Sequence, residues 1–394
     1  MRGDERRPSR GPEVLPEPIW VANEYEAYAW MSQWETPQWL TIDTEFNRET
    51  TFFPQLGVVQ VFADTWQQPL VMDGHQEPPS LLVDWVSDAA ITKVVFSGGE
   101  DYQILDRWLG RSIENIVDLQ WGIALMGGNA QMSLQRAAAD YLDIHLPKEH
   151  TRSDWSQRPL SPEQIAYAAN DVTVLGELLN HVRSELNRLE RWEWLVEDTR
   201  WQLQDALDMP TDDQAYKRVK GLARLSNLQR HRGSALARWR EQQAQEQDRP
   251  RGYFMKDDVL VKLAQVSPRS FRDLAKVKGV HQGALRRYGG DWLECLRDPE
   301  AQIEEPDMPK DWSDHHKQML NALREATKQV AARLQIMPEV VASRRHLTAL
   351  VRWFNGEVDQ PPRIMAGWRA HVAEQAWVEA CESLDGVSDS NGQH

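Results

Sequence analysis

Patterns typical of β-strands are confined to one part of this chain, and this restriction limits the folds available to it. Short runs rich in β-branched and aromatic residues predict five strands: 38–43, 57–62, 69–72, 92–96 and 113–119. Helical patterns at 80–88 and 101–109 alternate with the later strands, as in a mixed sheet flanked by helices. Beyond residue 120 only helical patterns follow, the first at 131–143, 161–185 and 187–207. The sequence therefore predicts one α/β domain followed by helical domains.

Chain length and local breaks suggest where these domains begin and end. A chain of 394 residues has room for two or three domains of about 150 residues each. Breaks rich in proline or acidic residues occur at 209–213 and around Pro306 and Pro309. We predict a flexible tail, an α/β domain, two helical domains and a disordered tail, in this order: 1–17, 18–208, 213–300, 308–385 and 386–394.

Composition indicates an ordinary globular protein. Hydrophobic residues make up 41% of the chain and charged residues 27%. The two cysteines, Cys295 and Cys381, cannot form a disulfide framework and suit the reducing cytoplasm. No apolar run approaches the roughly 18–20 residues of a membrane helix, and the N-terminus lacks the apolar segment of a secretory signal. We expect a cytoplasmic protein without a membrane partner.

Charge is unevenly distributed along the chain. The formal net charge is −15, yet residues 211–300 contain 19 Lys and Arg against 12 Asp and Glu. A basic region inside an acidic chain indicates a surface for a polyanion such as a nucleic acid. A solvated helical surface would give the same counts, so charge alone leaves both interpretations open.

Two acidic residues, Asp43 and Glu45, stand at the end of the first predicted strand. Side chains alternate along a strand, so these two carboxylates share a face and Thr44 points to the other. Like charges this close repel each other unless a cation lies between them. Carboxylate oxygens suit Mg²⁺ or Mn²⁺. The pair is a candidate metal site, although a solvated strand end has the same appearance in sequence.

Three more candidates follow in the chain. Asp101 comes after the strand at 92–96, near the carboxyl edge of the sheet where sites of α/β proteins lie. Its alternative role is an acidic residue in the first turn of a helix. Tyr167 and Asp171 are four residues apart and therefore share a helix face, in a helix whose start Ser161 predicts. Taken alone, this spacing also fits a core tyrosine and an exposed aspartate.

Together these residues resemble the active-site signature of the DEDD 3′–5′ exonucleases in their tyrosine variant. The order is Asp43-x-Glu45, then Asp101, then Tyr167-x-x-x-Asp171. Four neighbouring segments are similar to blocks of the same family: Glu45-Phe46-Asn47-Arg48-Glu49, Asp118-Leu119-Gln120, Ser153-Asp154-Trp155 and Arg158-Pro159-Leu160. The chain departs from the family at Phe96, near a position where relatives often carry histidine. The implied fold is ribonuclease-H-like, with a mixed sheet flanked by helices.

The resemblance implies hydrolysis assisted by two divalent metal ions, Mg²⁺ or Mn²⁺. By resemblance, Asp43 would bridge both ions, Glu45 and Asp171 would complete one site, and Asp101 would act mainly at the other. Tyr167 would orient or help to deprotonate the attacking water. Two such ions can activate a water and stabilise the leaving 3′ oxygen. The products would be nucleoside 5′-monophosphates released from a 3′ end.

The helical regions resemble a different family, the HRDC domain, which is a small all-α nucleic-acid-binding module. Residues 213–298 carry the closer likeness and residues 310–384 look like a more divergent copy. Basic residues of the first copy are candidate phosphate contacts: Arg224, Arg238, Arg240, Lys276 and Lys278. Each could equally face solvent without binding anything. The second copy is not evidently basic, so packing against the nuclease domain explains it as well as RNA binding does.

One exonuclease domain followed by two HRDC-type domains is most similar to the bacterial ribonuclease D family. The implied protein is an exoribonuclease, a monomer by default, that processes the 3′ ends of tRNA precursors and other small structured RNAs. A DNA-directed 3′–5′ exonuclease is one alternative, because the carboxylate motif does not fix the contacts that distinguish ribose from deoxyribose. A non-catalytic RNA-binding protein that keeps the fold is the other.

Overall fold

The computed structural model describes residues 16–147, 153–208, 211–297 and 312–390, which form two compact units. Of the described residues, the first unit contains 16–45, 56–147, 153–207 and 312–390. The second contains Phe46–Gln55, Asp208 and 211–297. The expected tail over 1–17 lies almost entirely outside the described residues.

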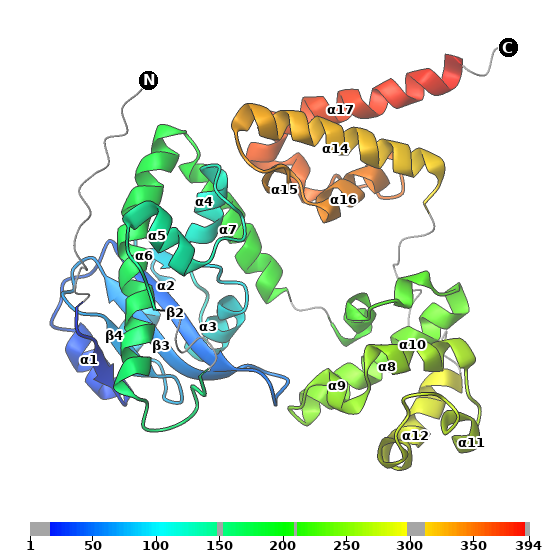
Figure 1. Ribbon diagram of the computed structural model, residues 1–394, viewed down its shortest axis with the longest axis horizontal. Coiled ribbons are helices and arrows are strands. Elements are labelled where there is room, and N and C mark those ends of the chain that lie inside the picture. Colours follow the sequence, from blue (N-terminus) through cyan, green and yellow to red (C-terminus); the bar gives the residue numbers. More distant parts are fainter. Residues whose placement is uncertain (1–15, 148–152, 209–210, 298–311, 391–394) are drawn as a thin grey trace. The chain divides into compact units, whose positions relative to one another are not determined.

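A six-stranded mixed sheet forms the centre of the first unit, in the order β1-β4-β3-β2-β5-β6 (Figure 1). The strands are β1 (Ile19–Val21), β2 (Trp39–Asn47), β3 (Gln55–Ala63), β4 (Leu70–Asp73), β5 (Thr92–Val95) and β6 (Ile116–Asp118). β2, β5 and β6 are parallel neighbours, β1 is parallel to β4, and β3 is antiparallel to β4. The predicted mixed sheet is confirmed, and β1 is an additional strand that the sequence patterns missed.

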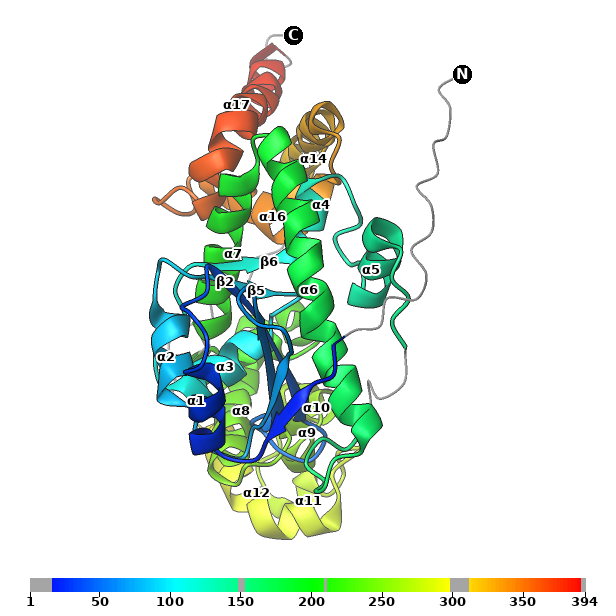
Figure 2. The same ribbon diagram turned by 90° about the vertical axis from the view of Figure 1, so that its left-hand side faces the viewer.

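Helices cover both faces of this sheet, with α1, α2 and α3 on one side and α6 on the other (Figure 2). The helices are α1 (Glu24–Met31), α2 (Ser80–Ser87), α3 (Asp101–Leu109), α4 (Leu119–Leu125), α5 (Leu134–Leu142), α6 (Pro162–Arg188) and α7 (Trp192–Leu207). Alternation along β5 explains the two layers, since Val94 packs with Leu175 of α6 whereas Val95 packs with Leu105 of α3. The ribonuclease-H-like fold class is confirmed.

The C-terminal helices belong to the same unit as the sheet. They are α14 (Asp314–Leu334), α15 (Pro338–Val341), α16 (Arg344–Phe354), the short η3 (Arg363–Met365) and α17 (Gly367–Ser390). Leu323, Val341 and Trp377 share one hydrophobic cluster with Leu125 and Leu195 of the α/β domain. The second helical domain therefore packs against the nuclease domain, which is one of the two interpretations that the sequence left open. Helix α17 continues to Ser390, which shortens the tail expected from residue 386.

The second unit is all-helical apart from the segment Phe46–Gln55. It contains η1 (Asp212–Arg218), η2 (Leu222–Arg224), α8 (Asn227–Glu246), α9 (Arg251–Phe254), α10 (Asp257–Val266), α11 (Phe271–Leu274) and α12 (Gln282–Arg297). Trp239 packs edge-to-face on Trp292, with ring centroids 5.9 Å apart, and both belong to its core. These tryptophans therefore serve packing.

Among the helices of the described residues, none is both long enough and apolar enough to cross a membrane.

Candidate active site

The central strand β2 and the helix α6 bring three of the predicted carboxylates together. Asp43, Glu45 and Asp171 each offer a carboxylate oxygen, and these oxygens lie within 4.8 Å of one another. Asp43 and Glu45 are partly exposed, whereas Asp171 is buried. The alternation along β2 thus places the two strand carboxylates on the face that α6 covers.

Local contacts explain why α6 meets β2 at this point. The helix begins where Ser161 predicts its start, and there Ser161 and Gln164 form a capping box. The Thr41 hydroxyl of β2 donates a hydrogen bond of 2.8 Å to the carbonyl of Val172, the residue after Asp171. Gly176 allows a close approach, because a Cβ atom there would lie 2.7 Å from the Trp39 ring. These contacts hold Asp171 opposite Asp43.

Asp101 approaches the cluster from the first residue of α3. It lies outside the group of three, but the Thr44 hydroxyl donates a hydrogen bond to its Oδ1. The turn before it is held by the buried carboxylate of Asp118. This carboxylate accepts hydrogen bonds from the backbone N–H groups of Ser97, at 2.9 Å, and Gly98, at 3.0 Å. Ser97 has a φ of 60°, so these bonds stabilise an unfavourable backbone conformation.

Burial perturbs all four carboxylates, and repulsion within the cluster adds to its effect at Asp43 and Glu45. Burial raises the pKa of Asp43 well above its ordinary value, and the charges of Asp101 and Asp171 add to this effect. Burial, followed by the charge of Asp43, raises the pKa of Glu45 to about 10. Burial raises the pKa of Asp101 to about 6 and that of Asp171 to about 7. A site that must ionise at neutral pH therefore requires compensating positive charge.

The donor set fits divalent metal ions. Three convergent carboxylates are hard oxygen ligands of the kind that Mg²⁺ and Mn²⁺ prefer. Asp43 also accepts a hydrogen bond of 3.0 Å on its Oδ2 from the buried side chain of Gln60. This contact, together with a hydrogen bond from the Thr44 backbone, helps to fix the orientation of the carboxylate.

The pKa values predict how stability depends on pH and on metal. Asp101 and Asp171 have folded-state pKa values above the ordinary 3.8, so they favour folding at low pH, and this contribution is lost as pH rises through about 6 to 7. In EDTA the melting temperature should therefore decrease between pH 5 and pH 8. Mg²⁺ or Mn²⁺ should raise it more at pH 8 than at pH 5, as thermal unfolding would measure. A metal-induced shift of the same size at both pH values would contradict this prediction.

Tyr167 lies beside these carboxylates, one helical turn before Asp171. Its side chain is only 6% exposed and makes a hydrogen bond to Asp171 that lowers the aspartate pKa against the larger effect of burial. Its ring packs on Trp155, with centroids 6.1 Å apart. The shared helix face predicted from the spacing therefore brings both residues to the cluster.

Of the five basic residues predicted to contact phosphates, the structure buries one and leaves the others at the surface of the helical module. Arg240 is 4% exposed, pairs with Asp257 at 2.7 Å and donates to the carbonyl of Met255, so its prediction as a phosphate contact is wrong. Its guanidinium stabilises the fold of the module. Arg238 pairs with Asp213 at 3.1 Å and remains 39% exposed. Arg224 is exposed at the end of η2.

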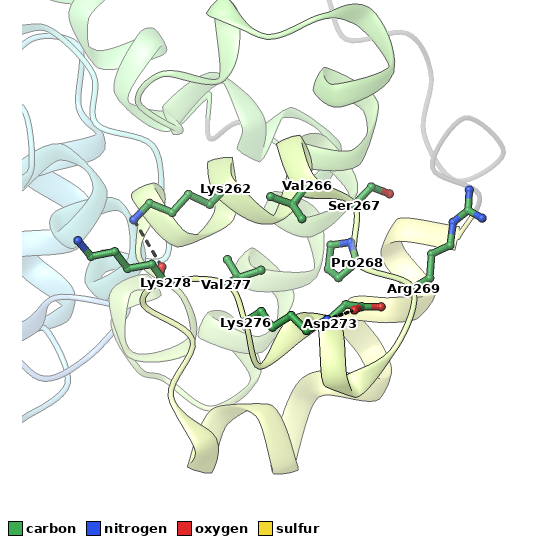
Figure 3. Close-up of a pocket in the computed structure, with 9 residues that line it drawn as sticks. All are labelled: Lys262, Val266, Ser267, Pro268, Arg269, Asp273, Lys276, Val277 and Lys278. Atoms are coloured by element: carbon green, nitrogen blue, oxygen red, sulfur yellow. Dashed lines mark hydrogen bonds and ion pairs between the residues drawn. The ribbon is translucent and has the colours of Figure 1, made fainter.

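Lys276 and Lys278 line a surface pocket of about 510 Å³ in this module (Figure 3). Lys262 and Lys278 lie at one end of it and Arg269 at the other. Val266 contributes an apolar wall and is 63% exposed. Asp273 is the one acidic side chain in the lining, and it pairs with Lys276 at 3.0 Å. The pocket thus combines excess positive charge with an exposed apolar surface.

Sequence reasoning missed the residues that hold the carboxylates in place. Thr44 was expected only to point away from Asp43, and nothing local indicated its bond to Asp101. Asp118 was noted only within a family-like segment, and its role in holding the turn before Asp101 became visible in three dimensions. A buried acidic residue at a strand end is the signal that could have identified Asp118.

Family models match three parts of the chain. A 3′–5′ exonuclease model matches residues 18–187, an HRDC domain model matches residues 229–296, and a model of the C-terminal HRDC domain of ribonuclease D matches residues 314–377. These matches correspond in order to the sheet domain and the two helical modules.

Relatives match the chain over nearly its full length. Ribonuclease D of Pseudomonas paraeruginosa is 31% identical over 386 residues, which cover 94% of this chain and 99% of the relative. Ribonuclease D of a Shewanella species is 27% identical and covers 91% and 92%. The crystal structure of Escherichia coli RNase D has the same fold, with a TM-score of 0.84 at 22% identity over 93% of this chain and 99% of that one. The chain belongs to the ribonuclease D family and is a 3′–5′ exoribonuclease.

Proposed function

We propose that this exoribonuclease shortens the 3′ ends of tRNA precursors and other small structured RNAs and releases nucleoside 5′-monophosphates. The cluster of Asp43, Glu45 and Asp171 beside Tyr167 is the observation that carries the proposal. The E. coli protein of the same fold is described as an exoribonuclease involved in structured RNA processing, which supports this substrate class.

The carboxylates would hold two divalent cations, either Mg²⁺ or Mn²⁺. Asp43, Glu45 and Asp171 would bind one, and Asp101 would act with Asp43 at the other. When bound, such ions would activate a water and stabilise the leaving 3′ oxygen. The chain itself contributes the phenol of Tyr167, which is anchored by Asp171 and would orient the attacking water or accept its hydrogen bond.

The reaction can be tested with a 3′-extended tRNA labelled at its 5′ end. We expect a ladder that shortens from the 3′ end with Mg²⁺ or Mn²⁺ and disappears in EDTA. Tyr167→Phe should reduce the rate about 10²-fold, the usual effect of a positioned proton-handling group, without reducing the melting temperature by more than about 2 °C. Asp171→Asn should abolish the ladder.

Two outcomes of this assay would support the alternatives. An intact RNA that the protein still shifts on a gel would favour a non-catalytic RNA-binding protein. Faster degradation of a DNA strand of the same sequence would favour a DNA exonuclease. Neither alternative is favoured by relatives that are named ribonuclease D over most of the chain.

The pocket around Lys276 and Lys278 is our candidate for the RNA contact of the first HRDC domain. Lysines of such a pocket can neutralise phosphates without reading sequence. Arg224 and Arg238 remain weaker candidates on the same module.

Charge reversal tests this pocket. Lys276→Glu combined with Lys278→Glu should raise the KM for a long RNA by about tenfold and flatten its salt dependence, because about two phosphate contacts are lost. The KM for a dinucleotide, which is too short to occupy two binding sites at once, should stay within twofold. Lys328→Glu, at an exposed lysine of α14, serves as the control. If Lys328→Glu raised the KM for the long RNA as much as the double lysine variant does, the assignment of the pocket would be contradicted.

We also propose that the protein works as a monomer in the cytoplasm. Cys295 and Cys381 are buried and form no disulfide within the described residues, which suits a reducing compartment. Size-exclusion chromatography with light scattering would test the monomer.

A further inference from the structure

A network around Arg158 connects the start of α6 with two strands of the sheet. Its Nε and Nη2 donate to the Asp73 carboxylate at 2.9 and 2.5 Å, and Nη2 also donates to the Gly57 carbonyl at 2.8 Å. Its Nη1 donates to the carbonyls of Trp155 and Gln157, both at 2.9 Å. A guanidinium has five N–H donors, and these five hydrogen bonds account for all of them. Arg158 therefore has no donor left for a phosphate.

The network fixes the backbone of Trp155 rather than its indole. Gly57 lies directly beneath this backbone, because a Cβ atom at Gly57 would lie 2.5 Å from the Trp155 carbonyl oxygen. The indole is 2% exposed, and its N–H has no hydrogen-bond partner among the described residues. Packing and the Arg158 bond to its carbonyl are thus what set the position of the ring.

The Trp155 ring in turn supports Tyr167. The two rings are 6.1 Å apart and belong to one buried cluster with Val58, Ala168 and Ala169. Arg158 also lies three residues before Ser161, the N-cap of the helix that carries Tyr167. The same guanidinium therefore constrains both the ring behind Tyr167 and the start of its helix.

We propose that Arg158 is a positioning residue that holds the Tyr167 phenol at its working position, with Asp73 as its anchor. The inference rests on the proposed role of Tyr167 in orienting water. The anchor is charged: burial acts to raise the pKa of Asp73, but the hydrogen bonds from Arg158 and from the His75 backbone, together with the charges of these two residues, lower it overall. Lysine in place of Arg158 would retain the ion pair and lose most of the hydrogen bonds to carbonyl oxygens.

A double-mutant cycle tests the connection to Tyr167. Arg158→Lys alone should reduce kcat by about 10- to 100-fold, as expected for a small displacement of a reacting group, and leave KM within twofold. In the Tyr167→Phe background the same substitution should reduce kcat by less than threefold, because the phenol that it positions is already absent. Melting temperatures of all variants are measured alongside, and rates are taken well below them.

Gly57→Ala is a second variant, which displaces the Trp155 backbone without changing the residue at position 158. It should show the same pattern, a loss of kcat that nearly disappears in the Tyr167→Phe background. If Arg158→Lys does not fold, Asp73→Asn replaces it in the cycle. Equal losses in both backgrounds, or a change in KM with kcat unchanged, would overturn the inference. A Tyr167→Phe enzyme with wild-type turnover would refute both the role of the phenol and the positioning role of Arg158. If Tyr167→Phe is slow but Arg158→Lys reduces kcat equally in both backgrounds, only the positioning role of Arg158 is refuted.

Discussion

Asp43→Asn is expected to reduce the exonuclease rate by about 10³-fold or more, or ~4 kcal/mol of transition-state stabilisation, while the protein stays folded. Asp43 shares its oxygen cluster with Glu45 and Asp171, and the charges of Asp101 and Asp171 raise its pKa further after burial. An amide cannot balance the charge of a divalent cation at this centre. The loss of activity should therefore reflect metal chemistry and not unfolding.

Whereas Asp43→Asn should lower the exonuclease rate, it should not lower the stability of the metal-free protein. Removing one negative charge from a crowded acidic site relieves repulsion, so the metal-free variant should melt at or above the wild-type temperature. The asparagine oxygen can still accept the hydrogen bond from Gln60. The stabilisation that Mg²⁺ gives to the wild type should largely disappear in the variant.

The measurement pairs single-turnover rates on a labelled RNA with thermal unfolding, each with Mg²⁺ and with EDTA. Asp84→Asn is the matched control, because that side chain is 65% exposed on α2 and lies 3.6 Å from Arg111. It should change neither rate nor stability. Asp43→Asn with near wild-type turnover would remove this residue from the proposed metal site.

Local sequence patterns predicted most elements of the α/β domain because its strands are short, apolar and separated by clear helix signals. β1 has only three residues, and α4 follows β6 without an intervening residue, so neither offered a pattern of its own. The start of α6 was visible because Ser161 and Pro162 are adjacent in the sequence and typical of a helix start, whereas its capping box with Gln164 was not predicted. Periodicity and capping act over a few residues, and predictions that depend on them were accurate.

The candidate site was predictable from the combination of its residues and not from any one of them. The carboxylate pair at a strand end and the tyrosine one turn before an aspartate each have an ordinary alternative, and only their order along the chain resembles a family signature. Arg240 shows the limit of this reasoning, because its charge suggested a phosphate contact while its helix face buries it against Asp257. Charge counts do not reveal which side of a helix becomes the core.

Contacts between residues distant in sequence were not predictable at all. Arg158 and Asp73 are 85 positions apart, and Arg369 and Asp198 are 171 apart. Each of these residues is an ordinary polar residue in its local context. Only the fold decides that a pair becomes buried and therefore important.

The Asp198–Arg369 pair leads to the second large expected effect, a loss of ~3–5 kcal/mol of stability in Arg369→Met. Both side chains are 3% exposed and join α7 of the nuclease domain to α17 of the second HRDC-like domain. Asp198 also accepts hydrogen bonds from the indoles of Trp121 at 2.6 Å and Trp368 at 3.1 Å. Removing the arginine leaves a buried carboxylate without a counter-charge, which costs more than the pair itself contributes.

A double variant distinguishes the cost of the uncompensated Asp198 charge from general damage to the interface. In Asp198→Asn/Arg369→Met the charge is removed, and the asparagine oxygen can still accept from an indole. Its stability should therefore exceed that of Arg369→Met alone, which is the sign of coupling expected for two residues in contact. Arg188→Ala is the control for losing an arginine, since its pair with Glu185 lies on the surface and should contribute little to stability.

Urea unfolding followed by tryptophan fluorescence suits this test because Trp194 and Trp368 stack at this interface, with centroids 4.4 Å apart. Limited proteolysis should cut the C-terminal helices of Arg369→Met earlier than those of the wild type. Turnover of a dinucleotide at low temperature should be unchanged, since neither residue belongs to the carboxylate cluster. If Arg369→Met were as stable as Arg188→Ala, the buried pair would not be what secures the second HRDC-like domain, and the surrounding apolar cluster would suffice.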